Sequence, residues 1–315
     1  MMQSKLDIPA TKQVNPDMFV PIVQDLANAE RIERKSLSAW QDMWYRLKGS
    51  KLAMVGFYMI IAIILLAIFG PIFSSYNHYS NDLVNSNQAP SLEHWFGTDD
   101  LGRDMFVRTW KGAQVSLFVG VMAALIDLVL GIIYGGIMGY FGGRVDEVMN
   151  RFSEILYAVP HLLVVILLLV IMEPSLTTII IAMSITGWIN MAWIVRGQIM
   201  QLKNLEYVLA SKSLGAGAMR IIFRQLIPNA MGPILVTLTF TVPGAIFAEA
   251  FLSFLGLGVQ SPVASWGTMI SSSISALTIF PWRLFFPALF LSLTMFAFNV
   301  FGDGLRDAFD PKLRR

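Results

Sequence analysis

The sequence contains no cysteine and few charged residues. Of its 315 residues, 14% are Asp, Glu, Lys or Arg, whereas 55% are hydrophobic and the mean hydropathy is +0.61. The absence of Cys excludes disulfides, thiolate nucleophiles and Cys-ligated zinc sites from this chain. A soluble domain of this length cannot bury so large an apolar fraction, so the composition indicates an integral membrane protein.

Motifs for catalysis and cofactor binding are also missing. No Gly-Lys pair occurs, so the phosphate-binding loop G-x-x-x-x-G-K-[ST] is absent and the chain is not expected to bind ATP in that way. The three histidines, His78, His94 and His161, form no H-E-x-x-H pattern and have no close second ligand for a metal. No strong nucleophile and base motif indicates an enzyme, and no basic stripe indicates nucleic-acid binding. We therefore expect a non-catalytic membrane protein without a cofactor or metal of its own.

Six apolar stretches are long enough to cross a bilayer as helices. Leu52–Phe73 carries no charge, and its length as a helix, about 33 Å, covers a hydrocarbon core of roughly 30 Å. Because the runs are continuous rather than alternating, they predict helices and not barrel strands. The expected fold is all-α and polytopic, with six transmembrane helices. The expected spans are Leu52–Phe73, Val115–Tyr140, Phe152–Met172, Leu176–Val195, Ala230–Leu257 and Leu284–Phe301.

The distribution of Lys and Arg predicts the orientation. Nineteen of these 23 residues fall in the segments 1–51, 141–151, 196–228 and 302–315. Basic loops remain on the cytoplasmic side, so both termini are predicted to be cytoplasmic. The expected organisation is a cytoplasmic arm (1–51), a first span (52–73), an extracytoplasmic loop (74–113), a five-helix core (114–302) with a cytoplasmic loop at 197–228, and a cytoplasmic tail (303–315). Within the arm, the aromatic-rich stretch Ala39–Leu47 predicts an interfacial amphipathic helix, with a simple tether as the alternative.

The longest internal cytoplasmic loop reads NLEYVLASKSLGAGAMRIIFRQLIPNAM, from Asn204 to Met231. Its composition predicts a helix over Leu205–Leu214, a turn at the following glycines and a second helix over Ala218–Ile227 that ends at Pro228. Small residues in this loop would let a partner approach the backbone. The loop is therefore either a docking surface or an ordinary solvated loop.

This loop resembles one found in permease subunits of bacterial ABC importers, which have the pattern E-A-A, three residues, Gly, nine residues, I-x-L-P. Ala210, Gly215 and Pro228 stand at matching positions. The sequence departs from the pattern at Leu209, Ser211, Gln225 and Ile227. In that family the loop forms a coupling helix that docks on an ATPase subunit. The resemblance implies this role for Leu205, Glu206, Leu209, Ala210, Ser211, Leu214, Gly215, Ala216, Gly217 and Ala218.

Three further stretches are similar to the second membrane subunit of dipeptide and oligopeptide importers. They are HWFGTDDLGRDMFVR (His94–Arg108), AEAFLSFLGLGVQSPVASWGTMI (Ala248–Ile270) and FNVFGDGLRDAFDPKLR (Phe298–Arg314). Together with the arm and the first span, the resemblance extends over nearly the whole chain. It implies the type I ABC importer permease fold and a chain closest to the C-type subunit of oligopeptide permeases, with oligopeptides as the favoured cargo.

The resemblance also implies the partners and the location. The expected partners are a homologous second permease, two ABC ATPase subunits that bind ATP and Mg, an extracytoplasmic peptide-binding protein, a peptide substrate and membrane lipid, but no nucleic acid. The expected location is the bacterial cytoplasmic (inner) membrane. Dipeptide and nickel importers of the same family share this pattern. An ion-coupled transporter or channel that acts alone is the alternative from another class.

The extracytoplasmic loop contains the motif GTDDLGRD. Here Thr98 is expected to cap a helix whose first turn carries Asp99 and Asp100, and Arg103 and Arg108 are expected to pair with the carboxylates. The alternatives are a rigid folded loop, a surface that shapes the outer vestibule or meets a solute-binding protein, and a calcium site, although the acidic spacing is not that of an EF-hand.

Five polar groups lie in or near the spans: Asp127, Glu154, His161, Asn190 and Glu249. A central charge costs about 3 kcal/mol in lipid, so these groups should face protein or water. Structural pairing is the favoured expectation, with lining of the pathway or a proton relay as the alternatives.

Small residues and prolines predict how the spans pack and bend. Gly131, Gly135 and Gly139 form small-x-x-x-small steps that predict the close approach of another helix. Kinks are expected at Pro160, Pro233 and Pro243. The fifth span is expected to break at Gly256 and Gly258, and Ser265, Trp266 and Gly267 are expected to begin a short segment at the outer interface.

Overall fold

The computed structural model describes residues 38–172, 175–260 and 262–310. Residues 1–37 of the expected arm and 311–315 of the expected tail lie outside the described residues. The chain divides into two units, Met1–Asp42 and Met43–Arg315. The described part of the first unit is the start of one helix, where the Asp42 amide donates to the Ser38 carbonyl at 2.9 Å. The second unit holds the predicted spans.

The described residues form helices and loops, and the only sheet-like feature among them is an isolated bridge between Thr98 and Asp104. Within the described part of the chain, five helical stretches are long and apolar enough to cross a membrane, or six if one bent pair is a single span. The longer helices are α2 (Ala39–Gly49), α3 (Lys51–Phe69), α4 (Met105–Phe141), α5 (Gly143–Ala158), α6 (His161–Met172), α7 (Leu176–Leu202), α10 (Ile227–Phe254) and α12 (Trp282–Phe309). The short ones are α8 (Glu206–Ser213), α9 (Ala218–Ile221), α11 (Trp266–Ser273), the 3₁₀ turns Gly70–Phe73, Leu83–Asn85 and Ile274–Ala276, and the π turn Ile222–Leu226.

The expected third span is not one continuous helix. It is divided into α5 and α6, which meet at an angle of 74°. The expected kink at Pro160 is the cause, because proline cannot donate the helical hydrogen bond and excludes the preceding residue from helical geometry. Val159 accordingly has extended angles, φ −76° and ψ 126°.

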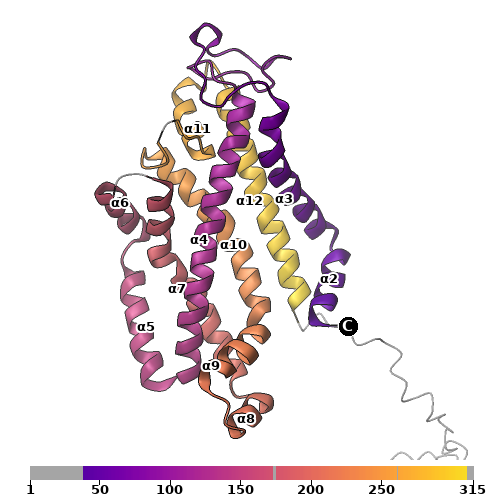
Figure 1. Cartoon of the computed structure of the whole chain (residues 1–315), viewed down its shortest axis with the longest axis vertical. Coiled ribbons are helices and arrows are strands. Elements are labelled where there is room, and N and C mark those ends of the chain that lie inside the picture. The colour runs from indigo at the N-terminus through magenta and orange to yellow at the C-terminus, as the bar shows by residue number, and fades with distance from the viewer. Residues whose placement is uncertain (1–37, 173–174, 261, 311–315) are drawn as a thin grey trace, which may run out of the picture. The chain divides into compact units, whose positions relative to one another are not determined.

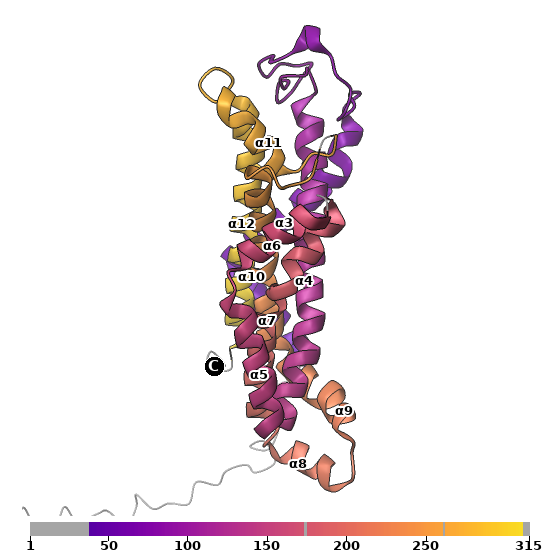
Figure 2. The same cartoon turned by 90° about the vertical axis from the view of Figure 1, so that its left-hand side faces the viewer.

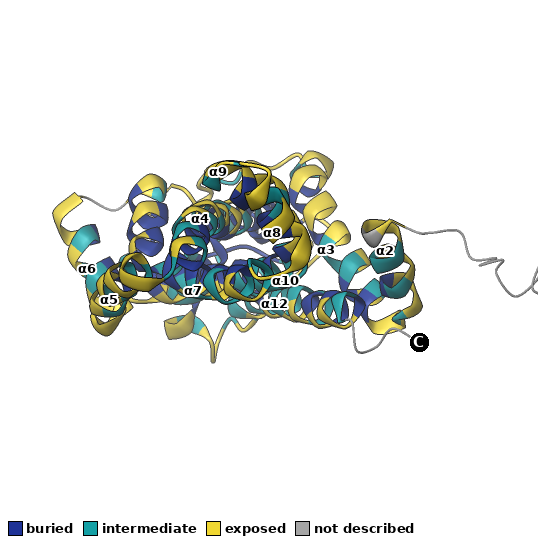
Figure 3. Ribbon diagram, turned by 90° about the horizontal axis from the view of Figure 1, so that it is seen from below, coloured by how far each residue is buried: buried dark blue, intermediate teal, exposed yellow. Residues whose placement is uncertain are grey.

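Glycines hold α4 directly against α7, as their spacing predicts. A Cβ atom on Gly131 would collide with Met191, one on Gly135 with the Ala192 carbonyl, and one on Gly139 with Ile199. The two backbones therefore approach too closely for any larger residue. Figure 3 shows buried residues where α4, α7 and α10 face one another, whereas α5 and α6 carry many exposed residues.

The contacts between helices establish which segments share an end of the second unit. Gly232 at the start of α10 lies against Phe309 at the end of α12, and Lys203 after α7 donates to the Gly139 carbonyl near the end of α4. The helix α8 is at this end, and α11 is at the opposite end with the loop that precedes α4 (Figures 1 and 2). The 204–231 loop and the loop that precedes α4 therefore lie at opposite ends of the second unit.

The second helix of the 204–231 loop does not end at Pro228, contrary to expectation. α9 continues through the π turn Ile222–Leu226 into α10, and Pro228 lies in the first turn of α10. The Ile227 amide donates to the Ile222 carbonyl, five residues earlier. This wider turn accommodates a proline that has no amide hydrogen of its own.

Candidate functional site

The loop that resembles a coupling loop is a short helix followed by a glycine turn. α8 begins after Leu205, which has extended angles, and ends at Ser213, with Leu214 as its C-cap. Gly215 has φ +83°, a conformation that L residues other than glycine rarely adopt, and it reverses the chain toward α9. Gly217 precedes α9 with φ −68°. The sequence predicted this helix and turn in their observed places.

One face of α8 packs on the body of the second unit and the rest is exposed. The Val208 side chain is 2% exposed and packs in a cluster that includes Ile199 and Ile221, whereas Leu214 is 89% exposed. Seven of the ten residues assigned to the coupling role are exposed, namely Leu205, Glu206, Leu209, Ala210, Leu214, Gly215 and Gly217, and the other three, Ser211, Ala216 and Ala218, are half-buried. The loop therefore presents leucines and an acidic side chain on its surface.

Two of the departures from the family pattern contact each other. Gln225, in the π turn, donates its Nε2 hydrogen to Ser211 Oγ at 2.7 Å. Ser211 in turn donates to the Tyr207 carbonyl at 3.0 Å. These two positions are far apart in the family pattern, but in the structure one hydrogen bond between them ties α8 to the π turn that leads into α10.

The base of this loop is also attached to neighbouring helices. Arg196 of α7 makes a two-pronged ion pair with Asp146 of α5, with Nε–Oδ1 and Nη2–Oδ2 distances of 2.5 and 2.6 Å. Lys203 Nζ donates to the Gly139 carbonyl at 2.8 Å and to the Tyr140 carbonyl at 3.3 Å. α8 is therefore bonded to the π turn that precedes α10, and the end of α7 is bonded to α4 and α5.

At the opposite end, Asp104 caps α4, so the assignment of the cap to Thr98 is wrong. Asp104 Oδ1 accepts from the Val107 amide at 2.8 Å, and its Oδ2 lies 2.9 Å from His94 Nδ1. Thr98 instead holds the loop, because its hydroxyl donates to the Asn85 carbonyl at 2.6 Å. The helix begins six residues later than the motif suggested because the intervening residues form a folded loop.

The predicted pairing of the arginines with the acidic residues is confirmed. Asp99 Oδ2 lies 2.7 Å from Arg103 Nε and 3.3 Å from Arg108 Nε, and Asp100 Oδ1 lies 3.2 Å from Arg283 Nη2. Arg283 belongs to no motif in the sequence, and it lies in the first turn of α12, so its ion pair joins this loop to that helix. Asp99 therefore joins the loop to α4 through Arg108, and Asp100 joins it to α12 through Arg283.

Burial and the charges of Lys111 and Arg108 lower the pKa of His78, which lies in the same loop. Its backbone carbonyl accepts from Arg108 Nη1 at 3.0 Å. Burial and the neighbouring charges therefore favour the neutral imidazole of His78 over its charged form.

The side chain of Trp266 is buried within the protein, although its position in the sequence suggested a tryptophan exposed at the outer end of the spans. It is 0% exposed, its indole Nε1 donates to the Thr109 carbonyl at 3.0 Å, and its amide donates to Ser116 Oγ at 3.2 Å. α11 is capped by Ser265, as its start was predicted. The helix is thus fixed against α4 by a buried tryptophan.

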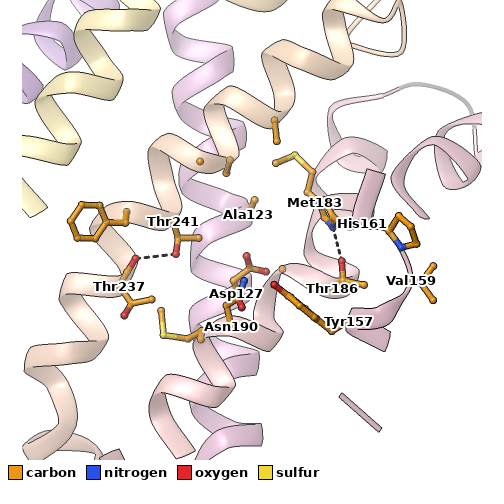
Figure 4. Close-up of a pocket in the computed structure, with 17 residues that line it drawn as sticks. Ala123, Asp127, Tyr157, Val159, His161, Met183, Thr186, Asn190, Thr237 and Thr241 are labelled. Atoms are coloured by element: carbon orange, nitrogen blue, oxygen red, sulfur yellow. Dashed lines mark hydrogen bonds between the residues drawn. The ribbon is translucent and has the colours of Figure 1, made fainter. Parts of the chain in front are cut away.

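A cavity of about 710 Å³ lies among α4, α5, α6, α7 and α10 (Figure 4). Three of the five polar groups singled out in the sequence line it: Asp127 from α4, His161 from α6 and Asn190 from α7. His161 Nδ1 lies 2.5 Å from Thr186 Oγ1. Asp127 is 6% exposed, and its Oδ1 has no hydrogen-bond partner among the described residues.

The other two polar groups lie elsewhere and have partners. Glu249 is fully buried and accepts hydrogen bonds from Ser116 at 3.0 Å and from Ser253 at 2.8 Å. Glu154 is bonded on its own helix, to Asn150 at 2.5 Å and Arg151 at 2.9 Å. The helical arrangement therefore separates Glu154 and Glu249, which have partners, from the cavity around Asp127.

Comparisons with known proteins agree with this architecture. The family described as "Binding-protein-dependent transport system inner membrane component" matches residues 128–315, and the family "N-terminal TM domain of oligopeptide transport permease C" matches residues 38–90. The oligopeptide transport system permease protein OppC of Bacillus subtilis (strain 168) is 60% identical over 304 residues, which cover 96% of this chain and 100% of the relative.

Two other relatives also match nearly along their whole length. The dipeptide transport system permease protein DppC of the same organism is 57% identical over 304 residues, 96% of this chain and 95% of the relative. The oligopeptide transport system permease protein OppC of Escherichia coli (strain K12) is 41% identical over 288 residues, 91% of this chain and 95% of the relative. The similarity thus spans the 204–231 loop, the cavity and the loop before α4.

Proposed function

This chain belongs to the family of binding-protein-dependent transport system inner membrane components, and from that premise we propose that it is a peptide-conducting permease subunit of an ATP-driven importer. The observation that carries the proposal is the 60% identity to an oligopeptide permease over 96% of the chain. A dipeptide permease is nearly as similar, at 57%. We therefore assign peptides as the class of cargo and favour oligopeptides.

The chain does not supply the energy for transport in this proposal. It has no Gly-Lys pair for a phosphate-binding loop, so ATP and Mg are assigned to two partner ATPase subunits. A homologous second permease completes the pathway, and an extracytoplasmic binding protein delivers the peptide. The end of the second unit that carries α8 is assigned to the cytoplasm, because nineteen of the 23 basic residues lie in segments predicted on that side.

Coupling in this proposal depends on the attachment of α8. When the ATPase subunits close, they move α8, whose exposed leucines form the docking surface. The movement reaches α10 through Val208 and the Ser211–Gln225 bond, since the π turn joins these residues to α10 without a break. α10 lines the cavity with Thr237 and Thr241. Shifting this helix between two packed positions opens the pathway alternately to the two sides of the membrane.

A matched pair of proline substitutions tests this assignment. Gly215→Pro places a residue restricted to φ near −65° where the backbone has φ +83°, so we expect the turn after α8 to be disrupted. Gly217→Pro is the control, because Gly217 has φ −68° and open space around it. Both variants should insert into the membrane.

The measurements are peptide uptake and co-purification of the ATPase subunits with the permease. We expect Gly215→Pro to abolish uptake and weaken the association, and Gly217→Pro to retain both. Normal uptake by the Gly215→Pro variant would reject the coupling role of this loop.

A further inference from the structure

The cavity among the central helices contains a carboxylate that the chain itself does not satisfy. Asp127 is 6% exposed, and its Oδ1 atom is buried without a hydrogen-bond partner among the described residues. Gly187 of α7 faces this carboxylate, and a Cβ atom there would collide with it. Gly187 therefore leaves space for the carboxylate and offers it no side-chain partner. An ionised carboxylate in such a position requires a cation or a strong donor from outside the chain.

The lining of the cavity favours a positively charged ligand. Asp127 is its acidic residue, and no Lys or Arg is among the residues that line it. Asp127 lies in the central part of α4, and Asn190 and Thr241 lie near the middle of α7 and α10. The cavity is therefore well within the depth of the spans, where an uncompensated carboxylate is costly and its attraction for a cation is strong.

Groups beside Asp127 are suited to a peptide backbone. Asn190 is exposed and makes no hydrogen bond within the described residues, so its amide offers both a donor and an acceptor. The Thr241 hydroxyl donates to the Thr237 carbonyl at 3.0 Å and can still accept. In Figure 4 the hydroxyl end of Tyr157 points toward Asp127 and Asn190. A volume of about 710 Å³ is within the range of small-molecule sites, roughly 300–1,000 Å³.

We propose that Asp127 receives the α-ammonium group of the transported peptide, while Asn190 contacts the first peptide group. This inference rests on the proposed function and adds that the permease itself recognises the free amino end. The ammonium supplies the donors that the buried carboxylate lacks. A peptide whose amino end is acetylated has neither the charge nor the three donors, so Asp127 does not strengthen its binding.

Uptake by the full complex tests the proposal with two substitutions and two peptides. Asp127→Asn keeps the shape of the side chain and removes its charge. Glu154→Gln is the control, because Glu154 lies outside the cavity and is bonded to Asn150 and Arg151. The peptides are a tripeptide with a free amino end and its N-acetyl form. The binding protein is the same for every variant. Its own preference for a peptide therefore cancels when the uptake of that peptide by each variant is divided by the uptake by the unsubstituted complex.

We expect Asp127→Asn to lower uptake of the free-amino peptide about tenfold or more, the effect of losing a hydrogen bond between two charged groups, and to leave uptake of the acetylated peptide unchanged. Glu154→Gln should change neither. Equal losses for both peptides would assign Asp127 to folding or to contact with the partner permease, and unchanged uptake would make it dispensable. Either result overturns the proposal. Failure of the unsubstituted complex to take up any peptide would instead reject the proposed function.

A second measurement decides the question if the binding protein rejects the acetylated peptide. The chain has no cysteine, so Thr241→Cys introduces its only thiol, within the cavity. In the complex without binding protein, the free-amino peptide should slow alkylation of this thiol several-fold. The acetylated peptide should not slow it, and neither peptide should do so when Asp127→Asn is added. Equal protection by both peptides, or protection by neither, would contradict the proposal.

Discussion

Replacing Ser211 with Ala should weaken the attachment of α8 to the rest of the second unit. Ser211 Oγ accepts a hydrogen bond of 2.7 Å from Gln225 Nε2, and Gln225 Oε1 is already buried without a partner among the described residues. The substitution therefore leaves both polar ends of the Gln225 amide unsatisfied. A buried polar group that loses its partner costs about 1–3 kcal/mol, and because both side chains are only half-buried we expect about 1 kcal/mol.

The double substitution provides an internal control. Gln225→Ile alone should cost less than Ser211→Ala, because the Ser211 hydroxyl still donates to the Tyr207 carbonyl. Ser211→Ala combined with Gln225→Ile removes both partners and restores the residues that the family pattern has at these positions. Replacing both partners with apolar groups can be nearly neutral, so the double variant should be more stable than Ser211→Ala alone.

Hydrogen exchange of the α8 amides is the appropriate assay, because opening of this short helix is local and leaves the bundle intact. A loss of about 1 kcal/mol corresponds to exchange about fivefold faster in Ser211→Ala, and the double variant should return close to the original rate. The reasoning would be refuted if the double variant exchanged as fast as Ser211→Ala, or if none of the variants differed.

Two further predictions concern stability. Gly135→Ala should destabilise the complex by about 1–3 kcal/mol, because the added methyl group meets the Ala192 carbonyl of α7. Gly244→Ala is the control and should not destabilise it, because there is open space at Gly244. Equal thermal stability of the two variants would contradict the close packing of α4 and α7. Asp104→Ala should cost about 1–2 kcal/mol through loss of the α4 cap, as measured by thermal unfolding of the complex, and an unchanged midpoint would argue against the cap.

The spans and the α4–α7 contact could be predicted from the sequence because each depends on a local pattern. Continuous apolar runs marked the helices, and the regular spacing of Gly131, Gly135 and Gly139 marked the face that approaches α7. The glycine turn after α8 followed from Gly215 in the same way. Such features are contained within a few helical turns of sequence.

Features that depend on distant residues could not be predicted. The bond between Ser211 and Gln225 requires the π turn, for which the sequence has no established signal. A tryptophan such as Trp266 suits either a membrane interface or a protein core. Only its contact with α4 in the folded chain shows that it is buried. Likewise, the sequence did not distinguish Asp127, which lies in a cavity, from Glu249, which is bonded to serines. Each of these outcomes was determined by the way in which separate helices pack together.

Peptide uptake into proteoliposomes tests the central claim most directly. The full complex, with both permeases, both ATPase subunits and the binding protein, should accumulate labelled peptide only when ATP is present, and this chain reconstituted alone should transport nothing under an ion gradient. Peptide accumulation by the chain alone, without nucleotide, would contradict the account and establish an independent transporter.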